Sequence, residues 1–377
     1  MPRKRSPFSL LKRGDTFYVR VWDPESKKYS TARSTGMTER RAAAIKAAKM
    51  VEEGLTPTKG QPLAVDYILE RINTSGTSGK YRKDGVQYID KYCRMSPEFS
   101  RLKLPDVQNK HLNRLVDFLK NQGLSGRTVN RIISYIKPAM KAAYMRGYIA
   151  KDPTAGKVEK LNENSMKRGS LSADEIRQII AMPPMGDKRF KPYMVTAILT
   201  GMRKGELRAL RWMDIDTARG VIRIRQSYTD VDGLTKPKTE ESAREVPILQ
   251  PVRDSLDELR NDSPYTDRED FVFYQANRGT PCPAHFTDKA FNATLDAVGI
   301  DGKERKRRHL VPHSTRHSFI TFCRALLPDF ITGGMSGHTT AQMIDNYGRP
   351  TAEHFRTARD VLNAALTVKP EGDKQIH

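Results

Sequence analysis

A glycine-containing turn carries the first residue that could do chemistry. Arg203 lies two residues after Gly201 in TGMRKGEL, between an apolar helical run and a second helical pattern. Glu206 is three residues further on, so its carboxylate can brace the guanidinium on one helical face. An arginine held in this way forms a rigid, bidentate clamp for a phosphate. The alternative is an ordinary ion pair on a helix surface, which contributes little.

Two histidines, a second arginine and a tyrosine follow along the chain. His313 and Arg316 in HSTRHS are three residues apart, so they share a face if the segment is helical. His338 ends GMSGH, and Tyr347 lies nine residues beyond it. A tyrosine attacks phosphorus only where the charge that builds up on the phosphate is offset, and two arginines with two histidines can offset it without a metal. Outside this context, Tyr347 would be read as a core residue.

A lysine near a turn could supply a proton. Lys236 and Lys238 in KPKTEESAREVP follow an alternating strand and a turn at Gly233. They are two residues apart, so both could face the same side of a hairpin. A lysine on a hairpin can reach into a cleft and protonate a leaving group. The alternative for each is a solvated surface lysine.

Several motifs of other enzyme classes are missing from the sequence. It has no phosphate-binding GxxxxGK[ST] loop, no GxGxxG and no HExxH. These absences argue against a nucleotide-hydrolysing motor, and the lack of a dense acidic cluster disfavours a metal-dependent nuclease. His313 and His317 have the spacing of a zinc pair, but no third ligand is obvious in such basic surroundings. We therefore expect neither a metal nor a cofactor.

The overall charge indicates the partner. The 377 residues include 66 Lys and Arg against 44 Asp and Glu, which gives a net charge of +22. Such an excess favours nucleic acid as partner over a merely solvated basic surface. No apolar run reaches the roughly 18 residues of a membrane span. We therefore expect no membrane partner. The three cysteines form neither a disulfide framework nor a metal knuckle, so we expect a cytoplasmic location.

Local patterns predict a multidomain protein, mainly α-helical with small β-sheets. The first block has strand patterns at 17–22 and 28–34, then a helix from Thr38 to Gly54. This small α+β module suits DNA binding, with a plain scaffold as the alternative. The second block is helical, with one helix in 111–123 and a long one capped by Ser125.

The third block is mixed. Ser172 is expected to cap its first helix, and strands are expected within 220–249 before helices return. Polar, Pro- and Gly-containing linkers separate the blocks. The predicted domains are 1–57, 61–158 and 165–366, with a polar tail at 367–377.

Basic residues outside the catalytic set are candidate DNA contacts. The basic residues of the long helix and of the run that starts at Lys303 would contact the DNA backbone, where contacts position a protein rather than read the sequence. The alternative is that these residues form solvated faces. The candidates are Arg3, Lys4, Arg5, Arg127, Arg131, Arg305, Lys306, Arg307 and Arg308.

Taken together and in order, these residues resemble the tyrosine recombinases, and more narrowly the phage-type integrases. The motifs are GMRKGEL with Arg203, KTEESAREVP with Lys238, HSTR with His313 and Arg316, GH with His338, and Tyr347 nine residues later. The middle block resembles the helical, SAM-like core-binding domain, and the first block resembles the arm-binding domain. Two departures, Ser-Thr before Arg316 and Ser336 where Leu is usual, remove no catalytic group.

The resemblance implies a specific reaction. Tyr347 would attack a DNA phosphodiester, form a 3′-phosphotyrosine and release a 5′-hydroxyl. Arg203 and Arg316 would clamp the nonbridging oxygens, while His313 and His338 would hydrogen-bond the phosphate. Lys238 would protonate the leaving oxygen; motif register prefers it, although Lys236 stays open.

The resemblance also implies an assembly. Four protomers would act on double-stranded DNA with core-type and arm-type sites, through a Holliday junction, to integrate or excise a phage or mobile element without ATP or metal. The helix that follows Tyr347 would dock into a neighbour. A host DNA-bending protein and an excision factor are further partners in this family. The alternatives are a type IB topoisomerase-like nicking and closing enzyme and a catalytically silent DNA-binding relative.

Overall fold

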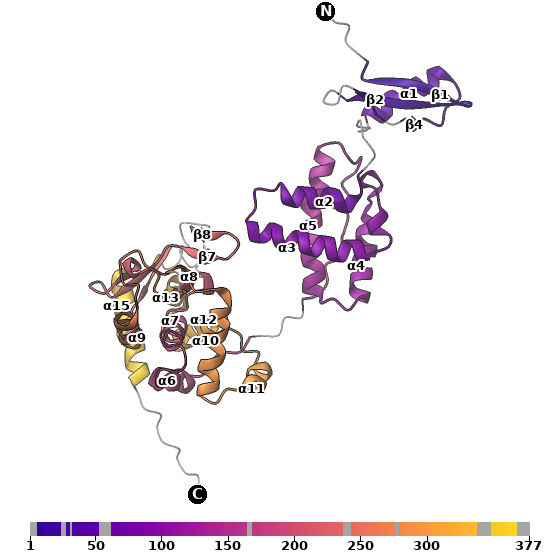
Figure 1. Ribbon diagram of the computed structural model, residues 1–377. Helices are drawn as coiled ribbons and strands as arrows, with labels where there is room; N and C mark the ends of the chain where they lie inside the picture. Colours follow the sequence, from indigo (N-terminus) through magenta and orange to yellow (C-terminus); the bar gives the residue numbers. More distant parts are fainter. Residues whose placement is uncertain are drawn as a thin grey trace, which may run out of the picture. The chain divides into compact units, whose positions relative to one another are not determined.

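The computed structural model describes residues 6–23, 28–30, 32–52, 62–163, 168–236, 243–275, 279–337 and 348–367. Contacts divide the chain into two compact units, Met1–Ser165 and Met166–His377 (Figure 1). Helices dominate both, with small sheets, as predicted. No helix in the described part of the chain is long and apolar enough to cross a bilayer.

A small antiparallel sheet begins the first unit. Strands β1 (Phe8–Arg13) and β2 (Thr16–Asp23) form its hairpin, and β3 (Lys28–Tyr29) and β4 (Arg33–Ser34) both pair with β2. The expected strand at 28–34 is therefore two short pieces, and β1 was not predicted. The hairpin places Leu10 opposite Val19, which is fully buried. Helix α1 (Arg40–Glu52) packs against it, as expected from its alanine-rich pattern.

The rest of the first unit is helical. Its main helices are α2 (Ala64–Asn73), α3 (Gly79–Tyr88), α4 (Asn109–Asn121) and α5 (Gly126–Met145). Ser125 caps α5 as predicted, since its side chain accepts a hydrogen bond of 3.3 Å from the Thr128 N–H. The apolar faces predicted for α4 and α5 are buried together in one core.

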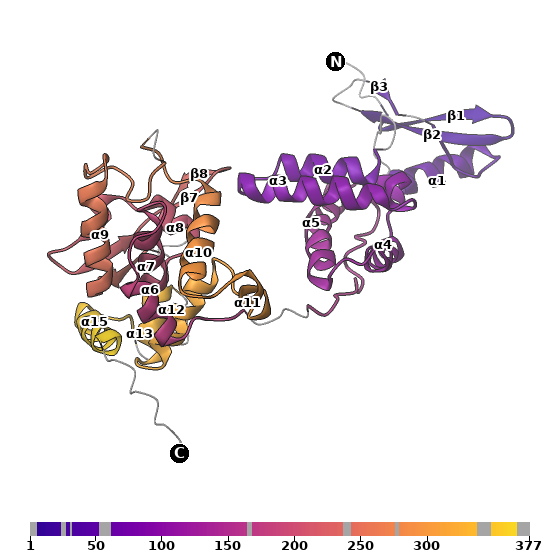
Figure 2. The ribbon, with the colours of Figure 1, turned by 60° about the horizontal axis from the view of Figure 1, so that its bottom comes forward.

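The second unit surrounds one buried helix. Helix α7 (Phe190–Thr200) is apolar on all sides and contacts α9 (Gln250–Asp262), α10 (Ala284–Ala297) and α12 (Ser314–Arg324). Figure 2 shows α7 between α9 and α10. The remaining helices are α6 (Ala173–Ala181), α8 (Lys204–Ala209), α11 (Gly302–Arg307), α13 (Asp329–Ser336) and α15 (Ala352–Thr367). Ser172 forms the predicted cap of α6, accepting from the Glu175 N–H at 3.2 Å.

Two small sheets lie on this unit. Strand β6 (Val221–Ile224) pairs with β5 (Ile215–Asp216) and β9 (Arg244–Pro247), and β7 (Ser227–Thr229) pairs with β8 (Gly233–Thr235). They confirm the strands expected within 220–249.

Helix α15 packs on β9 and α13 of its own unit. Its residues Ala358 and Leu362 are fully buried there. Part of the apolar face of this helix is therefore covered within its own unit, and its docking into a neighbour stays a prediction.

Candidate active site

The turn between α7 and α8 positions Arg203. Helix α7 ends at Gly201, which has a left-handed φ of 61°. A Cβ atom here would lie 2.3 Å from the Phe319 ring, so only glycine fits. The chain then extends, and Arg203 occupies the residue before α8.

Glu206 braces Arg203 as predicted. The Arg203 backbone N–H and one guanidinium nitrogen each donate a hydrogen bond of 2.8 Å to this carboxylate. The Glu206 side chain is buried, whereas that of Arg203 is 41% exposed. The guanidinium is therefore anchored on one side and open to a ligand on the other.

A second arginine, missed at the sequence level, binds the same carboxylate. Arg244 donates to both oxygens of Glu206, at 3.0 and 2.8 Å, and its Nε donates to the Met335 carbonyl at 2.8 Å. It lies on β9 and is buried, as is Val246 two residues on. An arginine that shares the apolar face of a strand was the available signal.

The two arginines control the charge of Glu206. Burial alone would raise the pKa of this carboxyl, but Arg244 and then Arg203 lower it to about 2. Glu206 therefore remains negative in the folded protein and stays paired with both guanidinium groups.

Removing this charge gives the first testable expectation. Glu206→Gln should destabilise the second unit by about 3–5 kcal/mol, because a buried pair that loses one partner leaves an uncompensated charge. The folded pKa lies below the ordinary 4.5, so the carboxylate's contribution is complete above pH 4.5 and is lost as the pH falls toward about 2. In urea unfolding, the difference in the free energy of unfolding between the variant and the wild type should narrow as the pH falls from 4.5 toward about 2.

Glu245→Gln is the matched control. This carboxylate pairs with Arg219 at 2.8 Å on the surface, where such a pair is worth about 0–1 kcal/mol. An equal loss of stability in both variants would contradict the role given to Glu206.

Arg316 lies deepest in the site. It is 1% exposed on α12, donates to the Gly201 carbonyl at 2.7 Å and also donates to the Ser336 carbonyl. Burial first, and then the charges of Arg203 and Arg244, lower the pKa of its guanidinium to about 9. Three guanidinium groups thus gather around a single carboxylate. Their positive excess suits an anion such as a phosphate.

His313 directly precedes α12, which carries Arg316. Burial first, and then the charges of Arg168, His317, Arg316 and Arg203, lower the pKa of His313 to about 4. Its imidazole is therefore neutral at neutral pH and can accept a proton or donate a hydrogen bond. The His313 and His317 rings are 5.3 Å apart, edge to face. Among the described residues, no group of three or more potential metal ligands gathers.

The titration of His313 is directly measurable. In ¹³C-labelled histidine spectra of the free protein, one imidazole should titrate near pH 4 rather than near its ordinary 6.5. That resonance should be missing from His313→Gln. A His313 midpoint above pH 6 would contradict the buried, cation-surrounded placement.

The remaining predicted catalytic residues fall largely outside the described residues. Lys238, His338 and Tyr347 are among those not described, as are Arg3, Lys4 and Arg5. Lys236 is described and exposed. Residues just before His338 are fixed, because Arg244 and Arg316 bind the carbonyls of Met335 and Ser336.

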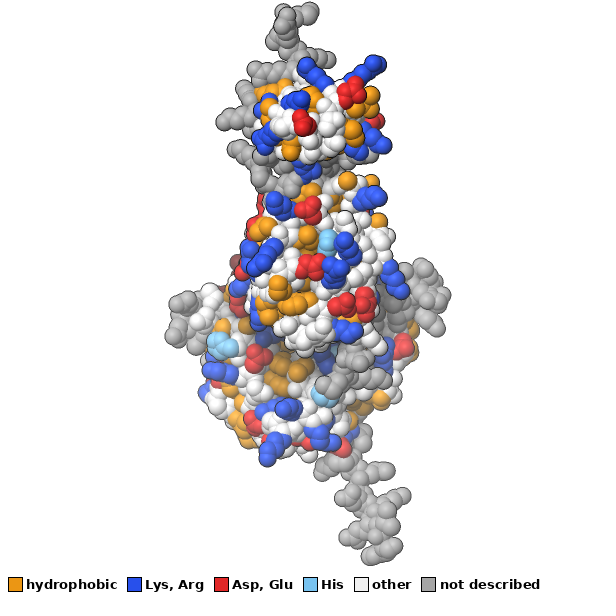
Figure 3. Space-filling view, turned by 90° about the vertical axis from the view of Figure 1, so that its right-hand side faces the viewer, with side chains coloured by type: hydrophobic (Ala, Val, Ile, Leu, Met, Phe, Trp, Pro, Cys, Tyr) orange, Lys and Arg blue, Asp and Glu red, His pale blue; other side chains and the backbone are white. Residues whose placement is uncertain are grey.

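Most other candidate DNA contacts bond within the chain. Figure 3 shows Lys and Arg side chains scattered among acidic ones over the visible face. In the first unit, Arg127 lies 3.5 Å from Glu163, and Arg131 donates to the Tyr135 hydroxyl at 3.2 Å.

The basic run on and after α11 behaves similarly. Carboxylates of Asp296, Glu304 and Glu175 bind, respectively, Arg305, Arg307 and Arg308. Lys306 is exposed. DNA contact by these residues stays a prediction, and the exposed candidates among them, Lys306 and Arg307, are the most available for it.

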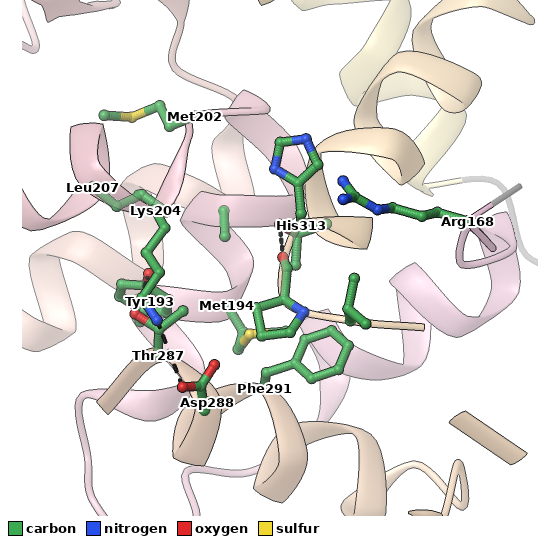
Figure 4. A pocket seen from close by; sticks show the side chains of 14 residues that line it. Arg168, Tyr193, Met194, Met202, Lys204, Leu207, Thr287, Asp288, Phe291 and His313 are labelled. Atoms are coloured by element: carbon green, nitrogen blue, oxygen red, sulfur yellow. Dashed lines mark hydrogen bonds and ion pairs between the residues drawn. The ribbon is translucent and has the colours of Figure 1, made fainter. Parts of the chain in front are cut away.

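A cavity of about 520 Å³ adjoins His313. Its walls are mostly apolar, with Met194, Leu207 and Phe291 among them. Figure 4 shows Lys204 on one side, where its amine lies 3.6 Å from Asp288, and Arg168 on the other side. The cavity therefore has basic side chains, Arg168 and Lys204, on two sides and apolar side chains along most of its wall.

Comparison with protein families gives two matches. Residues 170–354 match the model described as "Phage integrase family", and residues 64–161 match the "Phage integrase SAM-like domain". The first match contains the arginine cluster and His313.

Curated relatives and solved structures agree. The chain is 26% identical over 353 residues to the prophage integrase IntR of Escherichia coli, with 85% of this chain and 83% of that protein covered. It is 29% identical over 276 residues to the ICEBs1 integrase of Bacillus subtilis, with 69% and 73% covered. The fold is similar to that of the Tn1549 transposon integrase in complex with a circular intermediate DNA, with a TM-score of 0.62, 18% identity, and 79% of this chain and 98% of that chain covered. The fold is also similar to that of a lambda integrase tetramer bound to a Holliday junction. The TM-score is 0.52 and the identity is 18%, with 90% of this chain and 97% of that chain covered.

Proposed function

Because the chain belongs to the phage integrase family of tyrosine recombinases, we propose that it cuts and rejoins DNA through a 3′-phosphotyrosine intermediate. It is a site-specific recombinase that acts on phage or mobile-element DNA. The finer proposal concerns which residues carry the reaction and how the protomers assemble.

The arginine cluster is the observation that carries the proposal. Glu206 binds the guanidinium of Arg203, and the carbonyls of Gly201 and Ser336 bind that of Arg316. A phosphodiester gains negative charge on its nonbridging oxygens as a nucleophile attacks, and fixed guanidinium groups stabilise that charge without reorganising. Bidentate geometry adds orientation, which favours Arg over Lys at both positions.

The proton transfers follow from the neutral state of His313. The Tyr347 hydroxyl attacks phosphorus, its proton passes to a base such as His313, and the P–O bond to the 5′ oxygen breaks. Lys238 protonates that leaving oxygen, with Lys236 as the alternative, and His338 hydrogen-bonds the phosphate. The phosphotyrosine keeps the bond energy, so a 5′-hydroxyl of another strand can reverse the step without ATP or a metal.

The assembly proposed is a tetramer on two DNA sites, resolved through a Holliday junction. The lambda integrase relative is a tetramer on such a junction, which supports this reading. We infer core-type contacts from the second block and arm-type contacts from the first, with DNA-bending and excision factors as further partners. DNA of this kind is found in the nucleoid, so we infer a cytoplasmic site of action in a bacterial cell.

Nicked duplexes carrying DNA from beside the gene's own locus test the proposal. Incubation with the protein in EDTA should give a covalent adduct on a denaturing gel. Addition of a second duplex should then give recombinant strands. An adduct with relaxation of supercoils but no strand exchange would favour the topoisomerase-like alternative, and binding without an adduct would favour the silent relative.

A further inference from the structure

Arg168 begins the described part of the second unit, and the backbone after it is fixed there. A Cβ atom on Gly169 would lie 2.2 Å from the Arg308 carbonyl oxygen, so the segment packs directly against that backbone. The Ser170 carbonyl accepts a hydrogen bond of 2.8 Å from Arg308. The Leu171 N–H donates to the Ser318 hydroxyl at 2.8 Å in the buried interior.

The contact of Leu171 ties the segment 168–171 to the helix that carries Arg316, and the other two tie it to Arg308. Ser318 lies on α12, two residues after Arg316 and five after His313. Arg168 is therefore three residues from a buried contact with α12, and it lines the same cavity as His313. Figure 4 shows its guanidinium directed toward the His313 imidazole, at the rim of the 520 Å³ cavity.

The side chain of Arg168 differs from the other arginines of the site. Arg203, Arg244 and Arg308 each bind a carboxylate, and Arg316 donates to two backbone carbonyls. Within the described ranges, no hydrogen bond or ion pair ties the guanidinium of Arg168, and the residue is exposed. Its charge reaches both His313 and His317, where it opposes protonation. An exposed cation held next to other cations is unfavourable unless an anion joins them.

We propose that Arg168 is a further phosphate-binding residue of the active site, and that it contacts the DNA phosphate next to the one that reacts. The next phosphate on the same strand is about 3.4 Å further along the helix axis and is also displaced around it, so it needs a donor of its own beside the reacting phosphate, and Arg168 beside His313 is positioned as one. This inference rests on the proposed function. It makes cleavage depend on the docking of segment 168–171, which is where the chain enters the second unit.

The test compares Arg168→Ala with Arg324→Ala. Arg324 ends α12, which spans about 15 Å at 1.5 Å per residue, and pairs with Asp329 on the surface. Each variant removes one cation from the same unit. Single-turnover adduct formation at saturating protein should fall about 10- to 100-fold for Arg168→Ala and by less than about twofold for Arg324→Ala. Arg168→Lys should recover part of the rate.

A neutral phosphate identifies the contact. In this experiment, duplexes that carry one uncharged methylphosphonate near the nick are incubated with the wild type and with Arg168→Ala, and the cleavage rates are compared. At one flanking position, neutralisation should slow the wild type but should not slow Arg168→Ala further. If the methylphosphonate and the Arg168→Ala substitution slowed cleavage independently at every position tested, the proposal would be overturned. Equal thermal unfolding of Arg168→Ala and the wild type excludes simple misfolding.

The histidine spectra provide a second readout. Loss of the Arg168 charge should raise the midpoint of His313 from about pH 4, whereas Arg168→Lys should leave it near that value. An unchanged midpoint in Arg168→Ala would remove the guanidinium from the neighbourhood of His313 and overturn the proposal. If the wild type itself forms no adduct, the proposed function fails instead, which separates the two failures.

Discussion

Tyr347→Phe should abolish the covalent protein–DNA adduct while leaving DNA binding intact. The substitution removes only the hydroxyl oxygen that forms the bond to phosphorus. Loss of a nucleophile typically lowers a rate by more than about 10⁴-fold, so the adduct should fall below detection. Denaturing gels measure the adduct, and native gels with the same duplex measure binding.

Tyr265→Phe is the control for this change. Tyr265 lies in the second unit, and its ring packs on Tyr274 at 5.0 Å, in an aromatic pair that does not need the hydroxyl. Its adduct yield should equal that of the wild type. A normal yield from Tyr347→Phe would rule out Tyr347 as the nucleophile.

Arg316→Lys should lower the cleavage rate about 10²- to 10³-fold with little change in DNA affinity. A lysine keeps the charge but loses the planar fork, so it cannot hold the carbonyls of Gly201 and Ser336 and still present a donor to the phosphate. Removal of one preorganised donor at a developing oxyanion has an effect of this size. Single-turnover cleavage of a nicked duplex measures it.

Arg208→Lys separates catalysis from packing. Arg208 is equally buried, and its guanidinium binds the Cys282 carbonyl at 2.6 Å and the Asp230 carboxylate. This control should lower the unfolding temperature but not the rate per folded molecule. If the cleavage rates of Arg316→Lys and Arg208→Lys both fell in proportion to their unfolding temperatures, Arg316 would have a structural role only.

Local chemistry made part of the fold predictable. Ser125 and Ser172 were found as caps because a cap depends on residues within one turn. The bond from Arg203 to Glu206 was found for the same reason. Strand β1 was missed because its burial comes from pairing with β2, not from a clear alternation of its own.

Long-range contacts limited the prediction of the site. Arg244 binds a carboxylate 38 residues earlier in the chain, and Arg316 binds a carbonyl 115 residues earlier. No spacing rule connects such positions. Motif order predicted Arg316 as a catalytic residue, but it could not show that Arg244 shares Glu206 with Arg203. Motif order also carries the roles of Lys238, His338 and Tyr347, which lie outside the described residues.

The residue that becomes linked to DNA is the most direct test. The wild-type adduct formed in EDTA would be digested with nuclease and protease, and the peptide that retains nucleotide would be sequenced by mass spectrometry. We expect the nucleotide on Tyr347, joined through the 3′ phosphate, with a free 5′-hydroxyl on the released strand. Nucleotide on any other side chain, or a 5′ linkage, would contradict the tyrosine recombinase chemistry proposed for this chain.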